Sequence, residues 1–142
     1  MNTRIAIKIN ATLEDLSKVE SIIEGLHQEG KIPDEAYGNV LVVATEATLN
    51  AINHGSLSDA SKQVDFVLVI EGKKMTLEVS DTGRGFDYEN LPDPTDPANL
   101  EKVNGRGIYI MKNLSDDLEF LNKGATVRIT FELETPVPVA AR

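Results

Sequence analysis

The sequence predicts a two-layer α/β sandwich, with helices on one face of a β-sheet and solvent on the other. Three segments alternate strictly between apolar and polar residues, as half-buried strands do. Two other segments carry apolar residues at helical spacing. The 142 residues fit a single domain over residues 1–134, followed by a Pro-containing tail over residues 135–142 that we expect to be disordered.

A strand and an amphipathic helix come first. Isoleucine alternates with polar or small residues over residues 4–9, which predicts the first half-buried strand. Thr12 is a good N-cap for residues 13–29, whose apolar residues recur at helical spacing. Gly30 then follows as a stop signal for this first helix.

The second helix is predicted over residues 34–54. Pro33 fits its first position, and Gly55 ends it. Its residues are apolar around most of the helical circumference, as in helices that are buried on all sides. We therefore expect it to be the central helix of the domain.

The rest of the chain predicts a hairpin, a long loop, a short helix and two more strands. Residues 62–71 and 74–80 have the pattern of strands, and they are joined near Gly72. Residues 86–104 lack periodicity and contain three prolines, which predicts an irregular loop of the kind that often forms a lid. The remaining predicted elements are a helix from about Gly107 to Ser115, a strand over residues 117–121 and a strand over residues 126–133.

The composition excludes several classes of protein. The formal net charge is −9 and no basic stripe is present, so we expect no direct nucleic-acid binding, and we expect any macromolecular partner to be a protein. The absence of cysteine excludes disulfides and thiolate zinc sites. The amino terminus lacks the apolar region of a signal peptide, and the longest apolar run, residues 40–44, is too short to span a bilayer. We expect a cytoplasmic protein.

The segment EATLNAINHG, from Glu46 to Gly55, puts polar side chains on an apolar helix. In an α-helix each residue is rotated by about 100° from the one before it. Four polar residues then lie within about 80° of one another around the helix axis and share one face: Glu46, Asn50, Asn53 and His54. A carboxylate among apolar neighbours is costly to bury unless it is paired, solvated or acts as a base. Asn50, one turn after Glu46, offers an oxygen to a hard cation such as Mg²⁺ and leaves the carboxylate free for proton transfer. Capping and solvation explain Asn53 and His54 about as well.

The segment DTGRGF, from Asp81 to Phe86, follows a predicted strand. A carboxylate only accepts hydrogen bonds, and the exocyclic amine of adenine donates them, while Gly83 and Gly85 let the backbone approach the ring. Asp-Thr-Gly also occurs in aspartic proteases, but that interpretation needs an essentially all-β chain. A plain structural turn remains the alternative for this segment taken alone.

The segment NGRGI places Gly105, Arg106 and Gly107 directly before a predicted helix that begins near Ile108. The first amides of a helix have no intrahelical partners, and they bind phosphate through oriented N–H groups and the helix dipole. The chain has no GxxxxGK[ST] loop and no HRD or DFG motif. The sequence therefore resembles neither a P-loop ATPase nor a eukaryotic-type protein kinase.

In this order the motifs resemble those of the Bergerat-fold (GHKL) ATPases, and within them the bacterial anti-sigma factor serine kinases. The resemblance covers about residues 4–133. EATLNAINHG resembles the N-box, DTGRGF the G1 box, NGRGIYIMKNLSD the G2 box with its helix, and NKGATVRITF the terminal strand. The resemblance implies the Bergerat ATP-binding fold, an α+β sandwich with a mixed, mostly antiparallel sheet and helices packed on one face.

The resemblance also implies ATP and Mg²⁺ as cofactors and assigns roles to residues. Asp81 holds the adenine amine, Asn50 binds Mg²⁺, and Glu46 is the base that activates the attacking group. Residues 87–104 form the ATP lid, which we expect to be mobile without nucleotide. The nucleotide-binding residues are then Asn50, Asn53, Asp81, Gly83, Gly85, Gly105, Arg106, Gly107, Ile108 and Thr126. One departure from the family is Ala125, because the family commonly has Thr directly after the glycine at 124.

The subfamily follows from Glu46 and from the length of the chain. Sensor histidine kinases usually carry Asn at this position and an attached phosphoacceptor domain, and the gyrase and chaperone relatives are longer. The anti-sigma type that this chain best resembles binds a sigma factor and phosphorylates an antagonist protein on serine. The alternatives are a module that uses ATP only as a structural ligand while it sequesters a regulator, and a stand-alone histidine-kinase-type ATPase domain. We also expect residues 4–9 to lie at a sheet edge and to join a second copy in a homodimer.

Overall fold

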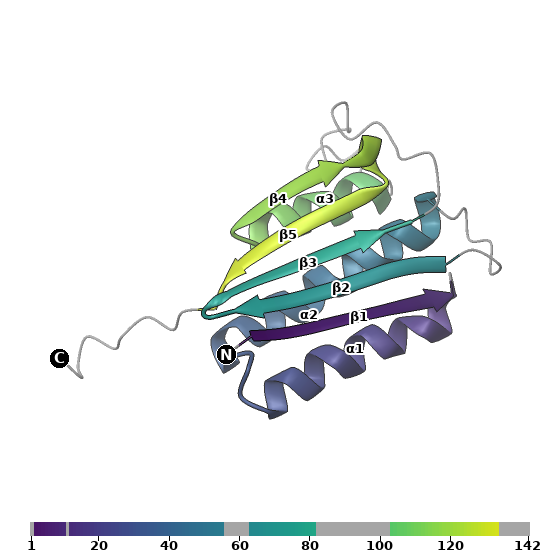
Figure 1. Ribbon diagram of the computed structural model, residues 1–142. Helices are drawn as coiled ribbons and strands as arrows, with labels where there is room; N and C mark the ends of the chain where they lie inside the picture. The colour runs from purple at the N-terminus through teal and green to yellow at the C-terminus, as the bar shows by residue number, and fades with distance from the viewer. Residues whose placement is uncertain (1, 11, 56–62, 82–102, 134–142) are drawn as a thin grey trace.

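The chain folds into two layers, a β-sheet and a layer of helices behind it (Figure 1), in a computed structural model that describes residues 2–10, 12–55, 63–81 and 103–133. The elements in chain order are β1 (Asn2–Asn10), α1 (Leu13–Gln28), α2 (Asp34–Asn50), the π-helical turn η1 (Ala51–Gly55), β2 (Gln63–Glu71), β3 (Lys74–Ser80), α3 (Val103–Leu114), β4 (Asp117–Leu121), the 3₁₀ turn η3 (Asn122–Gly124) and β5 (Thr126–Glu132). The predicted α+β class is confirmed. The tail over residues 135–142 and residues 87–102 of the predicted lid lie outside the described residues.

The sheet has the strand order β1-β2-β3-β5-β4, and its four pairings are all antiparallel. The parallel pairing of a mixed sheet is therefore absent from the strands that the structure describes. β1 lies at one edge of the sheet, as predicted, and β4 at the other. The register places Asn2 and Glu132 at one end of the sheet, and Ser80, paired with Thr126, at the opposite end.

The predicted boundaries of α1 are confirmed by its caps. The N–H of Asp15 donates to the Oγ1 of Thr12 at 3.3 Å, so Thr12 is the N-cap. Gly30 has φ +78°, in the left-handed region that glycine adopts easily after a helix end. The Asp15 carboxylate also accepts a bond from the N–H of Asn10 at 2.8 Å, which ties the end of β1 to the start of α1.

The second helix, α2, lies between α1 and α3 (Figure 1), so the prediction of a central helix is confirmed. Pro33 is its N-cap, one position before the first helical residue. The α-helix ends at Asn50 instead of residue 54, and η1 continues the chain. Because π-helical bonding links residues five apart, it widens the turn and rotates the residues after Asn50 away from the face that a continuous α-helix would give them.

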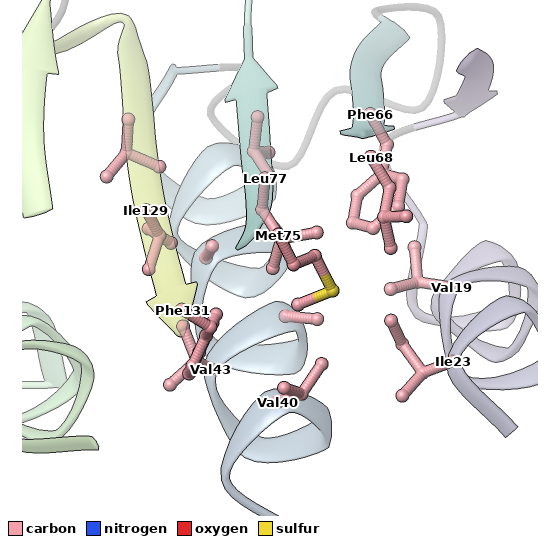
Figure 2. Packing of buried hydrophobic residues seen from close by; sticks show 14 of the residues in the cluster. Val19, Ile23, Val40, Val43, Phe66, Leu68, Met75, Leu77, Ile129 and Phe131 are labelled. Carbon is pink, nitrogen blue, oxygen red and sulfur yellow. The ribbon is translucent and has the colours of Figure 1, made fainter. Parts of the chain in front are cut away.

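The core fills the space between the sheet and the helices (Figure 2). Side chains from the central strands that point toward α1 and α2 are Phe66, Leu68, Met75, Leu77, Ile129 and Phe131. They meet Val19 and Ile23 of α1 and Val40 and Val43 of α2, all of which are buried. This packing fixes α2 against the sheet, and so it fixes the polar residues that α2 carries.

The hairpin and the last two strands also match their predicted positions. Gly72, in the turn between β2 and β3, has φ +61°. The third helix differs, because it begins at Val103 and not near Gly107. None of the described helices combines the length and apolarity that a membrane span requires.

Candidate functional site

A pocket opens at the end of the sheet where β3 ends and β5 begins. Its described lining residues are Ala47, Asn50, Ala51, Val79, Asp81, Met111, Phe120, Gly124, Ala125 and Val127. It is a small pocket that is partly open to solvent. Apart from Asn50 and Asp81, the lining side chains are apolar, which suits the faces of an aromatic ring.

Asp81 directly follows β3 and lines this pocket. Its backbone N–H donates to the carbonyl of Ala125 at 2.9 Å, which holds the residue against the start of β5. The side chain is half-buried. Because a carboxylate only accepts hydrogen bonds, the pocket presents an acceptor to a ligand that carries a donor such as an amine.

Glu46 and Asn50 lie one turn apart on α2, and both reach the same point of α3, at Gly107. A β-carbon built on Gly107 would lie 2.9 Å from the Oε2 of Glu46. It would lie 3.4 Å from the Oδ1 of Asn50 and 3.5 Å from its Nδ2. The structure therefore brings together the carboxylate and the amide of one motif and the glycine of another. Glu46 is half-buried, whereas Asn50 is only 8% exposed.

The side-chain nitrogen of Asn50 is buried and has no hydrogen-bond partner among the described residues. A buried donor left unpaired costs about 1–3 kcal/mol, so native structures rarely keep one without a reason. An acceptor brought by a ligand, such as a phosphate oxygen or a metal-bound water, would satisfy it. This unpaired donor lies on the same residue that lines the pocket.

The same residues fit Mg²⁺ that arrives together with a nucleotide. The described part of the chain holds no group of three or more His, Cys, Asp or Glu side chains that could hold a metal ion. Mg²⁺ is usually held by one or two protein oxygens together with substrate phosphates and water. The Oδ1 of Asn50 is an oxygen ligand of that kind.

Thr126 and Ile108 lie close to the pocket but do not line it. The hydroxyl of Thr126 is 2.9 Å from the hydroxyl of Ser80 and accepts a bond from the Nδ2 of Asn122 at 3.0 Å. These bonds join β3, β5 and η3 behind the pocket wall. Ile108 is buried in the hydrophobic core. The Ala125 position lines the pocket itself.

The other predicted residues fall in η1, in α3 or outside the described residues. Asn53 is exposed in the π-helical turn η1 and is not among the pocket-lining residues. His54 is also in η1, but its side chain is not described, and Gly83 and Gly85 lie outside the described residues.

The glycine-rich segment that was predicted to precede α3 lies within it. α3 begins at Val103, so its first four N–H groups belong to residues 103–106, and the N–H of Gly107 lies inside the helix. Gly105 and Arg106 lie in the first turn of α3, so they are near its start although they do not precede it. Each glycine costs about 1 kcal/mol in helix propensity, which is why the sequence predicts a later start. The close contact of Gly107 with α2 helps to explain why the helix includes it.

Several pocket residues were not predicted. Ala51 directly follows Asn50, and Val79 lies two positions before Asp81, on the same side of its strand. These short distances along the chain could have identified both residues. Met111 and Phe120 had no local signal, because only the packing of α3 and β4 brings them to the pocket. Asn122 does not line the pocket but bonds to Thr126 beside it. It had a local signal, since an asparagine near a glycine often adopts positive φ, and here its φ is +53°.

Known proteins resemble this chain over most of its length. The family profile of the histidine kinase-like ATPase domain matches residues 9–131. The serine-protein kinase RsbW of Listeria monocytogenes (serovar 1/2a, strain ATCC BAA-679 / EGD-e) is 23% identical over 137 residues, covering 92% of this chain and 87% of RsbW. RsbW of Bacillus cereus strain AH187 is 24% identical over 134 residues, covering 89% and 83%.

A solved structure shares the fold. It is the crystal structure of the RsbU and RsbW domains of a Mycobacterium tuberculosis protein, with a TM-score of 0.65 and 16% identity. The match covers 92% of this chain and 32% of that longer chain, so this chain spans about a third of its length. Together with the family match, it confirms the fold class and the resemblance to Bergerat-fold ATPases of the anti-sigma kinase type.

Proposed function

The chain belongs to the histidine kinase-like ATPase family, and we propose that it is an ATP-dependent serine-protein kinase that acts as an anti-sigma factor. Its substrate in this proposal is a small antagonist protein, phosphorylated on serine. The observation that carries the proposal is the meeting of Glu46 and Asn50 at Gly107, next to a pocket that contains Asp81. The residues proposed as base, metal ligand and ring-binding acceptor all lie at one end of the sheet.

The proposed chemistry gives each residue a separate task. When bound, Mg-ATP would supply the γ-phosphoryl group, which passes to the serine oxygen as its bond to ADP breaks, and ADP leaves. Asp81 accepts a hydrogen bond from the adenine amine, while apolar residues such as Val79 and Met111 contact the ring. Asn50 would hold the metal through Oδ1, and its Nδ2, which has no partner among the described residues, would donate to an oxygen of the ligand. Glu46 takes the proton of the incoming serine hydroxyl and so makes its oxygen a better nucleophile.

The relatives and the charge support the proposed partners. The Listeria and Bacillus relatives are named serine-protein kinases, and each match covers more than four fifths of both chains. A sigma factor would be the sequestered partner, and the antagonist would release it. With a formal net charge of −9, the chain is proposed to act on proteins in the cytoplasm without direct contact to nucleic acid.

The test is phosphotransfer with the purified chain. It uses Mg-ATP labelled at the γ-phosphate and a candidate antagonist encoded next to this chain, with a variant antagonist whose acceptor serine is alanine as the control. We expect acid-stable phosphoserine on the antagonist, and no label on the alanine variant or with Glu46→Gln. Acid-labile label would favour a histidine-kinase-type domain. Nucleotide-dependent binding of a partner without label would favour the binding module.

A further inference from the structure

We propose that Gly107 is a positioning residue that sets the side-chain geometry of Glu46 and Asn50, an inference that rests on the proposed function of these two residues. Gly107 is buried in α3, and α3 lies beside α2 (Figure 1). Without a side chain at this position, the backbone of α3 comes close to both polar groups. The helix surface itself then forms the wall against which they are held.

The distances show how little room remains. At 2.9 Å from Oε2 of Glu46, a β-carbon on Gly107 would be closer than such atoms normally approach one another. Its distances to Asn50, 3.4 Å and 3.5 Å, are ordinary van der Waals contacts. A methyl group here therefore conflicts with the carboxylate and merely touches the amide.

The atom that a methyl group would meet is the far end of a flexible side chain, not backbone. The cheapest response is a rotation of the Glu46 carboxylate, with α2 and α3 left in place. Gly107→Ala is thus a substitution that moves the proposed base while preserving the fold. Misplacing a reacting group by about 1 Å can cost about 100-fold in rate.

The contact also matters for Asn50, whose Nδ2 has no hydrogen-bond partner among the described residues. Hydrogen bonds to that nitrogen therefore do not fix the amide, and contact with α3 contributes more to its orientation. Because this contact is an ordinary one, we expect a smaller displacement of the amide than of the carboxylate.

Two other helical glycines provide matched controls. Gly25 in α1 and Gly38 in α2 have open space, with nothing within 4 Å of an added β-carbon. Gly25→Ala and Gly38→Ala introduce the same methyl group into a helix without meeting a neighbour. Since alanine is the better helix former, both controls should melt at the same temperature as the wild type or higher.

The experiment measures stability, nucleotide affinity, turnover and side-chain geometry for the full chain. For Gly107→Ala we expect kcat to fall by about 10- to 100-fold, with the Kd for Mg-ATP changed by less than about threefold. Both controls should keep kcat. Glu46→Asp shortens the base by one methylene, so in the Gly107→Ala background it should cost less than in the wild type, which a double-mutant cycle detects.

A second readout does not depend on transfer. In NMR spectra, the side-chain amide signals of Asn50 and the labelled carboxyl carbon of Glu46 should shift in Gly107→Ala and stay in place in Gly38→Ala. Unchanged signals, or an unchanged kcat, would overturn the inference. If Gly107→Ala instead lowered the melting temperature and the affinity for Mg-ATP together with kcat, the role of Gly107 would be packing alone, and the inference would be wrong. If the wild type transfers no phosphate, the proposed function fails, while the NMR comparison still decides whether Gly107 sets the two side chains.

Discussion

Replacing Asp81 by asparagine tests base recognition without disturbing the backbone of the site. The N–H of residue 81 would keep its bond to the carbonyl of Ala125, since that bond does not involve the side chain. In the described pocket lining, Asn50 is the other polar side chain, and it lies toward Gly107. No described neighbour in the lining therefore replaces the lost carboxylate as an acceptor for the ring.

The expected magnitude follows from the charge of the acceptor. A hydrogen bond to a charged group contributes about 1.5–3 kcal/mol, which corresponds to a loss of about 10- to 150-fold in affinity. The introduced side chain would retain an amide oxygen as a neutral acceptor, so the lower half of this range is expected for Asp81→Asn. Titration calorimetry with Mg²⁺ and a non-hydrolysable ATP analogue measures the change.

The control for charge is Asp65→Asn. Asp65 lies in β2, pairs with Lys8 at 2.8 Å and has a half-exposed side chain, so its replacement removes one negative charge without touching the pocket. We expect its Kd to match that of the wild type.

A second ligand makes the assignment specific. Inosine triphosphate carries a carbonyl where ATP has the amine, so the wild type should bind it more weakly than ATP. In Asp81→Asn that difference should largely disappear, because the two changes remove the same interaction. Two results would remove Asp81 from the base-binding role. One is equal ATP affinity for Asp81→Asn and the wild type, and the other is a variant that still binds inosine triphosphate more weakly than ATP by the wild-type factor.

Four further predictions address other parts of the molecule. Glu46→Gln should lower phosphotransfer by about 100- to 10,000-fold with little change in ATP affinity, as expected for loss of a general base, whereas Asn50→Ala should lower both, because it removes a metal ligand. Ala125→Thr adds a hydroxyl to the pocket wall and should tighten ATP binding by about two- to tenfold, the value of one neutral hydrogen bond of about 0.5–1.5 kcal/mol. The pKa of the Asp15 carboxyl is lowered from 3.8, first because the N–H of Asn10 bonds to the carboxylate. The ionised carboxylate therefore contributes fully to the stability of the fold above pH 3.8, and this contribution is lost as the pH falls through the folded pKa. Asp15→Asn should accordingly lower Tm at pH 7, with a difference that shrinks below about pH 4. The exposed edge of β1 should join a second copy, giving a dimer mass by light scattering at tens of micromolar.

Each of these predictions has an outcome that contradicts it. Wild-type transfer by Glu46→Gln would remove the base assignment. Unchanged affinity in Ala125→Thr would mean that position 125 does not contact the base. A Tm difference for Asp15→Asn that is constant from pH 7 to pH 3 would exclude the ionised carboxylate as its cause, and a monomer mass would exclude the β1 dimer.

The parts of the fold that sequence predicted well are those set by local periodicity. The alternation of apolar residues in β1 and β5 and the caps of α1 depend on neighbours in the chain, so they were predictable. Glu46 and Asn50 share a face because they are four residues apart, which is also a local relation. The end of α2 was not predictable, because no residue pattern in AINHG distinguishes a π-helical turn from an α-helical one.

The parts that could not be predicted depend on packing between elements. The contact of Gly107 with Glu46 requires the distance between α2 and α3, which no single segment encodes. The hydrogen bond between Ser80 and Thr126 requires β3 and β5 to be neighbours, although 46 positions separate the two residues. The family resemblance placed Thr126 among the nucleotide-binding residues, but the register gives that hydroxyl two protein partners.

The antiparallel register has a practical consequence for handling the protein. Asn2 and Glu132 lie at the end of the sheet opposite Ser80 and Asp81 (Figure 1). β3 alone has seven residues, and the steps between them, at roughly 3.3 Å each, separate its two ends by about 20 Å. An affinity tag, a fluorophore or a fused reporter attached before Asn2 or after Leu133, whose N–H bonds to Lys73 at the same end of the sheet, would thus begin far from the pocket. Either route would keep the point of attachment to a biosensor surface away from the pocket.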